Sequence, residues 1–210
     1  MSEKSVGSFS IALLSDLWAV SGLPLGNIFG LAAENYMQER RHEARDILLE
    51  AFERGDCEFD ELDADPLISI FLRYGRAVEH GAANRNLRLM AQVIVGQKRN
   101  KALSGDAFNR WASILSDLTR DEILTAGKAY AFAIDINGND DDAVNRFWKR
   151  FSPAMESSGY SQSSIFSLCA SIARFGLLLP HSAWDGMIYY PSEWLFELCK
   201  LADLNVATDS

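Results

Sequence analysis

Three polar residues in one predicted helix come closest to a metal-binding pattern. His42 and Glu43 match the first half of the zinc-protease motif, but Asp46 stands where the second histidine should be. Aspartate can bind zinc, yet no third ligand stands at a recognisable spacing, and the stretch equally fits a solvated helix face. The other histidines, His80 and His181, have no cysteine or carboxylate partner at ligand spacing. The sequence therefore predicts no metal site.

The segment 135–140 resembles the start of a calcium-binding EF-hand loop. The sixth loop position requires glycine and carries Asp140, and the twelfth requires glutamate and carries Arg146. Because both diagnostic positions fail, a turn followed by a helix cap explains these residues. The chain also lacks a P-loop, a dinucleotide-binding glycine fingerprint and a nucleophile elbow. We expect no catalytic residue and no cofactor, and therefore a protein that is not an enzyme.

The three cysteines give no support for a disulfide framework. Cys57, Cys169 and Cys199 are far apart and never form a CxxC pair. Reduced thiols packed in helices explain them, which is typical of a reducing compartment. The first ten residues also lack the long apolar core of a signal peptide. These features predict a cytoplasmic protein.

Helical spacing of apolar residues dominates the chain and predicts a mainly α fold. We expect about eight helices in a bundle-like arrangement. Thr119 and Glu122 have the spacing of a capping box, which marks a helix start. Asp65 followed by Pro66 predicts another start, with the aspartate as the cap. The Ser-Pro pair at 152–153 predicts that a helix restarts there.

The last third of the chain changes character. The short apolar runs 177–180 and 187–190 predict two strands, with a turn at Asp185 and Gly186 between them. A final helix is expected to begin at Pro191 and the serine that follows it. Helix, hairpin and helix in this order predict a winged-helix-like ending with one short β-hairpin.

Residues 57–65 are acidic and lack periodicity, so they form the best candidate linker. They separate an N-terminal helical segment, 8–56, from a main helical domain, 65–210, that contains the hairpin. A chain of 210 residues can also form one continuous domain. Both organisations stay open.

Residues 11–33 contain a single charged side chain, Asp16, and are long enough to span a bilayer. The glycines from Gly22 to Gly30 have GxxxGxxxG spacing, which lets helices approach closely in membranes. Pro24 favours a different interpretation, in which a second helix begins in a buried segment of a soluble protein. Peripheral membrane contact through 11–33 therefore stays an alternative. In that case the protein would be a membrane-active effector that uses this segment.

Basic residues form a predicted stripe near the middle of the chain. The candidates are Arg73, Arg76, His80, Arg85 and Arg88. If the helix were continuous, all of these except Arg85 would line one face together with Asn84, and Arg85 would lie close by. Gly81 is expected to interrupt the helix. The stripe fits either a solvated face, paired with the acids of 58–65, or a docking surface for an acidic partner or a phosphate-bearing ligand.

Aromatic residues are concentrated near the C-terminus. The candidates are Trp184, Tyr189, Tyr190 and Trp194. Such side chains supply most of the hot-spot energy at protein interfaces, which favours a protein partner or self-association. Packing of the hairpin against the helices explains them equally well.

The charge balance disfavours nucleic acid as the partner. The net charge is −9, whereas nucleic-acid binding needs a basic face. In the winged-helix alternative, a DNA-binding regulator, residues 161–176 would enter the major groove. This segment offers only Gln162 and Arg174 for base or phosphate contacts.

Three stretches together suggest a family. Residues 81–97, 113–123 and 174–195 resemble bacterial helical proteins, some from mobile or prophage regions, and more distantly the abortive-infection alpha-type family. The resemblance implies a bacterial protein with a phage-defence or regulatory role, and it supplies no catalytic residue. Combined with the missing motifs, it favours a non-catalytic regulatory or protein-interaction protein.

Overall fold

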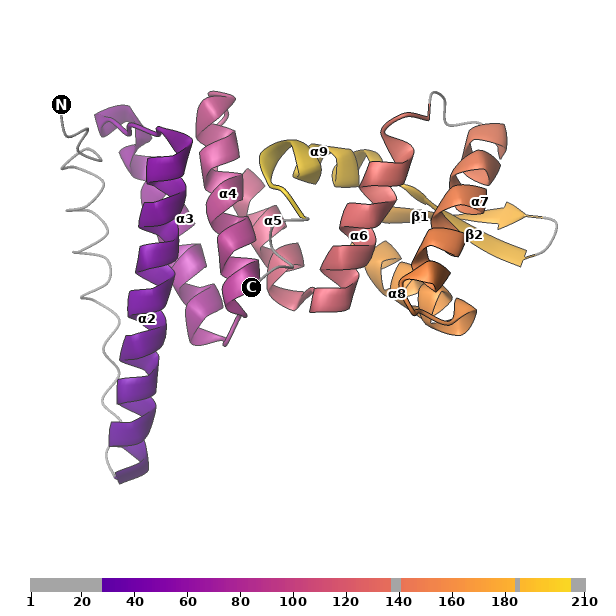
Figure 1. The fold of residues 1–210 in the computed structure, drawn as a ribbon. Helices are drawn as coiled ribbons and strands as arrows, with labels where there is room; N and C mark the ends of the chain where they lie inside the picture. Colours follow the sequence, from indigo (N-terminus) through magenta and orange to yellow (C-terminus); the bar gives the residue numbers. More distant parts are fainter. Residues whose placement is uncertain (1–27, 137–140, 184–185, 205–210) are drawn as a thin grey trace. The chain divides into compact units, whose positions relative to one another are not determined.

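The computed structural model describes residues 28–136, 141–183 and 186–204. Within these ranges the chain forms eight α-helices, a short 3-10 helix and one antiparallel hairpin, so the predicted mainly α fold with a late hairpin is confirmed (Figure 1). No helix in the described ranges is long and apolar enough to cross a bilayer. Most of the segment 11–33 lies outside the described residues.

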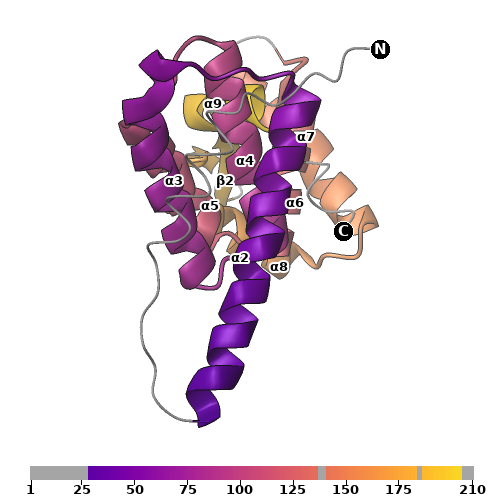
Figure 2. The same ribbon diagram turned by 90° about the vertical axis from the view of Figure 1, so that its left-hand side faces the viewer.

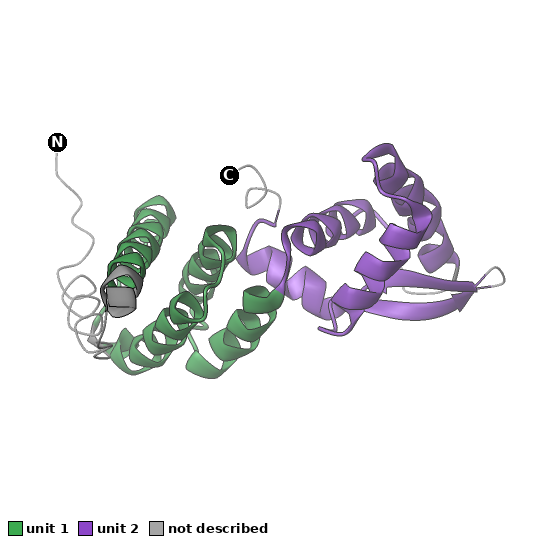
Figure 3. Ribbon diagram, turned by 90° about the horizontal axis from the view of Figure 1, so that it is seen from below, with its two compact units in different colours: residues 1–117 green, residues 118–210 purple. Residues whose placement is uncertain are grey.

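Backbone contacts divide the chain into two units. Unit 1 comprises residues 1–117 and unit 2 comprises residues 118–210 (Figure 3). The acidic segment 57–65 lies within unit 1, and its middle forms the 3-10 helix η1 (Glu61–Asp63).

The described part of unit 1 contains four helices. They are α2 (Ile28–Gly55), α3 (Ala64–Glu79), α4 (Asn84–Arg99) and α5 (Gly105–Asp117). Of these, α4 contacts the other three. Figure 2 shows α2 and α3 on either side of α4, and α4 also contacts α5. Leu87, Met90 and Ile94 of α4 are fully buried, as their helical spacing predicts for a core helix.

The start of α3 differs from the sequence prediction. The helix begins at Ala64, so Asp65 lies in its first turn and is not the capping residue. The capping position belongs to Asp63, whose carboxylate makes no cap and instead pairs with Lys98 of α4. The 3-10 turn before α3 and this interhelical ion pair move the helix start toward the N-terminus.

The described part of unit 2 contains the hairpin and four helices. The elements are α6 (Arg120–Ala133), α7 (Asp141–Ser157), α8 (Gln162–Ala173), β1 (Leu178–Ala183), β2 (Gly186–Pro191) and α9 (Glu193–Leu201). Strand β2 contacts α6, α7 and α9, whereas β1 contacts α8. The predicted order of helix, hairpin and helix at the end of the chain is confirmed.

The predicted restart at 152–153 is wrong, because α7 continues through Pro153. Phe147, Phe151 and Met155 form a stripe with one helical turn between neighbours, and each is at most 1% exposed. Burial of this stripe on both sides of Pro153 holds the helix together despite the missing backbone N–H.

Candidate functional site

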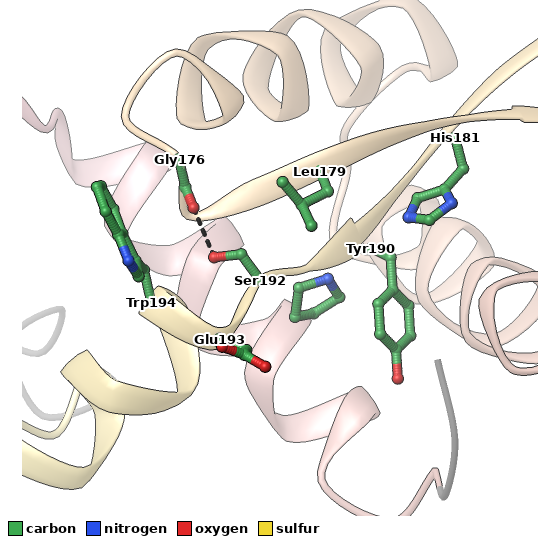
Figure 4. Close-up of a pocket in the computed structure, with 8 residues that line it drawn as sticks. Gly176, Leu179, His181, Tyr190, Ser192, Glu193 and Trp194 are labelled. Atoms are coloured by element: carbon green, nitrogen blue, oxygen red, sulfur yellow. Dashed lines mark hydrogen bonds between the residues drawn. The ribbon is translucent and has the colours of Figure 1, made fainter. Parts of the chain in front are cut away.

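The candidate site is a groove of about 460 Å³ in unit 2 where the hairpin meets α9. We call it the aromatic groove. Its lining residues are Gly176, Leu179, His181, Tyr190, Pro191, Ser192, Glu193 and Trp194. Figure 4 shows Trp194 at one end, Tyr190 and His181 at the other, and Leu179, Ser192 and Glu193 between them. The turn before β1, one face of the hairpin and the first turn of α9 therefore build the site together.

The hairpin register places three of the lining side chains on one face. Leu179 pairs with Tyr190, and His181 lies two residues further along β1. The rings of His181 and Tyr190 meet edge to face, with centroids 6.3 Å apart. The ring of Phe147 of α7 packs against that of Tyr190, with centroids 5.3 Å apart. Tyr190 is therefore only 4% exposed and is held in place by this packing. Leu179 is 47% exposed beside it.

The other end of the groove depends on a left-handed glycine. Gly176 has a φ of +74°, and a Cβ added there would lie 3.1 Å from the indole ring of Trp194. Glycine therefore satisfies both the backbone conformation and the close approach of the ring. The hydroxyl of Ser192 donates to the Gly176 carbonyl at 2.5 Å and accepts from the N–H of Leu195. This N-cap fixes the start of α9 against the turn before β1.

Glu193 supplies the groove's carboxylate. It is exposed in the first turn of α9, where the positive end of the helix dipole favours an acid. Within the described part of the chain, no hydrogen bond or ion pair engages this carboxylate. The groove thus combines aromatic and aliphatic surface with one unpaired negative charge, and its serine hydroxyl is engaged in the cap of α9.

A second, polar cleft of about 430 Å³ lies between the start of α6 and one face of α8. Glu122 accepts hydrogen bonds there from the Thr119 N–H at 2.7 Å, the Thr119 hydroxyl at 2.8 Å and the Ser171 hydroxyl. Burial raises the pKa of Glu122, but these hydrogen bonds and the nearby Arg174 guanidinium outweigh it and lower the pKa. Glu122 is therefore a saturated capping carboxylate and a poor general base.

The thiols lie in environments that suppress nucleophilic chemistry. Burial raises the pKa of Cys169 to about 12, and burial together with the charge of Asp203 raises the pKa of Cys199 to about 12. Burial also raises the pKa of Cys57, although Arg99 and Lys98 oppose it. Since the thiolate is the reactive form, these thiols are poor nucleophiles at neutral pH.

The structure separates the predicted aromatic residues. Tyr190 and Trp194 come together in the aromatic groove. Tyr189 lies on the opposite face of the hairpin. Its ring packs against that of Trp148 of α7, with centroids 6.2 Å apart, so it helps to pack the hairpin against this helix. Trp184 lies outside the described residues.

Sequence reasoning did not propose the six other lining residues as part of a site: Gly176, Leu179, His181, Pro191, Ser192 and Glu193. Leu179 and His181 could have been found by counting outward from the predicted turn, because cross-strand pairing assigns them to the face of Tyr190. Nothing local indicates that Gly176 meets the ring of a residue eighteen positions later.

The predicted basic stripe does not form one helix face. Arg73 and Arg76 lie on α3, whereas Arg85 and Arg88 lie on α4. The two helices are separated at His80 and Gly81, and Gly81 has a φ of +81°. The sequence predicts this interruption at Gly81.

Two further predictions concern polar residues of unit 1. Arg73 donates to the Ser113 hydroxyl of α5 at 2.9 Å. Asp63, the last residue of η1, pairs with Lys98 and not with a residue of the stripe. Glu43, from the zinc-like pattern, accepts from Asn84 at 3.1 Å and pairs with Arg40 at 3.5 Å. Among the described residues, no cluster of three metal-ligating side chains is found.

Comparisons with protein-family models, curated proteins and solved structures find no match for this chain. The geometry of the aromatic groove therefore carries the functional argument.

Proposed function

We propose that this chain is a non-catalytic protein-interaction protein that binds a peptide segment of a partner in the aromatic groove. The supporting observation is a preformed concave site in which large apolar side chains stay accessible. Trp194 is 42% exposed and Leu179 is 47% exposed, although both line the groove. Tryptophan is one of the residue types that most often dominate binding energy at protein interfaces.

The dimensions of the groove suit side chains of a peptide. Its volume of about 460 Å³ lies in the range of about 300–1,000 Å³ typical of ligand pockets. The Ser192 cap and the packing of Tyr190 on Phe147 hold its walls in place before any ligand arrives. A rigid site loses little conformational entropy on binding, which favours recognition of short segments.

The proposal is tested by panning a displayed random peptide library against the full chain. Enriched peptides should lose affinity by about 30-fold, or about 2 kcal/mol, with Trp194→Ala, because the largest exposed ring of the groove is removed. Met187→Ala is the matched control, since Met187 is 48% exposed on the same hairpin and does not line the groove. Its affinity should change by less than about twofold.

Circular dichroism of both variants separates lost binding from lost folding. The proposal fails if no peptide is enriched, or if a folded Trp194→Ala protein binds the enriched peptides as well as the Met187→Ala protein does.

A further inference from the structure

We infer that the aromatic groove selects a cationic side chain, arginine or lysine, on the bound peptide. The inference rests on the proposed function and names the chemistry of its ligand. It comes from the juxtaposition of the Trp194 and Tyr190 rings with the unpaired carboxylate of Glu193 in one cavity.

The carboxylate sets the sign of the charge that the groove accepts. Glu193 stays hydrated while the groove is open, and it has no hydrogen-bond or ion-pair partner among the residues that the structure describes. A ligand that fills the groove displaces water from this carboxylate, which is costly unless the ligand supplies a donor or a positive charge. Arginine and lysine provide both, whereas an acidic side chain would be repelled.

The aromatic rings favour the same ligand. A guanidinium or ammonium group is attracted to the face of an aromatic ring, most strongly to tryptophan. The rest of either side chain is aliphatic and can pack along Leu179 and Pro191, which also line the groove. Arginine fits best, because its planar group stacks on a ring while it donates to a carboxylate.

The lining residues include no lysine or arginine. The guanidinium carbon of Arg174, two residues before Gly176, lies 4.5 Å from the ring centroid of Phe175. Arg174 does not line the groove. Acidic residues also outnumber basic ones over 118–210, so the wider field of unit 2 attracts a basic segment.

The test uses four octapeptide pools with random flanks and a fixed central residue: arginine, citrulline, norleucine or glutamate. Citrulline has nearly the shape of arginine without its charge. Binding to the full chain is measured by fluorescence polarisation. The arginine pool should bind about 3- to 30-fold more tightly than the citrulline pool, the range expected for cation–π contacts with a carboxylate nearby. The glutamate pool should bind most weakly.

Two variants of Glu193 connect this preference to the groove. Glu193→Gln should lower the ratio of arginine to citrulline affinities by about threefold, and Glu193→Lys should favour the glutamate pool. Glu156→Gln removes the same charge from an exposed position of α7 outside the groove and should leave the ratio unchanged.

The outcomes distinguish the two proposals. If all pools bind equally and Trp194→Ala abolishes their binding, the groove binds peptides but does not select a cation, and this inference is overturned. An unchanged ratio in Glu193→Gln overturns it as well. If no pool binds more tightly to the parent than to Trp194→Ala, the proposed function fails too.

Discussion

Replacement of Gly176 by alanine probes the construction of the groove. Gly176 has a φ of +74°, where an alanine costs about 1–2 kcal/mol. Its Cβ would also lie 3.1 and 3.2 Å from two ring carbons of Trp194, so the indole must move by a few tenths of an ångström. Overpacking of this kind costs about 1 kcal/mol or more. We expect Gly176→Ala to lower the free energy of unfolding by about 2–3 kcal/mol.

Gly159 provides a matched control in the same unit. Its φ is +92°, but a Cβ there would meet nothing within 4 Å. Gly159→Ala should therefore show only the backbone cost of about 1–2 kcal/mol. The difference between the two variants isolates the contact between Gly176 and Trp194.

A double-mutant cycle completes the experiment. In a Trp194→Ala background, Gly176→Ala should cost no more than Gly159→Ala, because the ring that meets the new Cβ is gone. Unfolding in urea, followed by far-UV circular dichroism and tryptophan fluorescence, gives the free energies. Equal destabilisation by Gly176→Ala and Gly159→Ala in the parent chain would refute the reasoning, as would an excess that survives removal of Trp194.

Two further predictions concern titratable groups. Because the folded state lowers the pKa of Glu122 below that of the unfolded chain, the stabilisation is complete above the unfolded-state pKa and is lost as the pH falls through the folded-state pKa. Stability measured against pH should therefore fall less steeply in acid for Glu122→Gln, and superimposable curves would contradict this. Cys169 and Cys199, whose pKa values burial raises to about 12, should resist iodoacetamide at neutral pH in the native protein and react after denaturation. Rapid native labelling of both, detected by mass spectrometry, would show that the thiols are accessible and ionised.

Local signals in the chain succeeded where the responsible groups are close in sequence. The capping box of Thr119 and Glu122 forms as predicted, with the side chain of each residue bonded to the backbone of the other. Ser192 caps α9 at the predicted start of the last helix, and Gly81 lies at the predicted interruption between α3 and α4. Each of these features involves atoms within about one helical turn, so the residue types alone specify them.

Two local predictions failed because distant contacts prevailed. Asp65 has the sequence neighbours of a cap, but the ion pair of Asp63 with Lys98 and the preceding 3-10 turn shift the start of α3. Pro153 should interrupt a helix, but the buried stripe that includes Phe151 and Met155 carries α7 through it. In both cases tertiary packing outweighed a propensity that acts over a few residues.

By itself, the sequence determined the helical class, the late hairpin and the aromatic character of the C-terminal region, because periodicity and residue type encode these properties locally. It also singled out Tyr190 and Trp194, which line the groove. Only the tertiary structure decided which aromatic residues share a surface. Strand register turns Tyr189 toward Trp148 and Tyr190 toward His181, and the left-handed turn at Gly176 brings the ring of Trp194 to the same cavity. A groove assembled from a turn, a hairpin face and a helix start exists only when these separate segments are packed together.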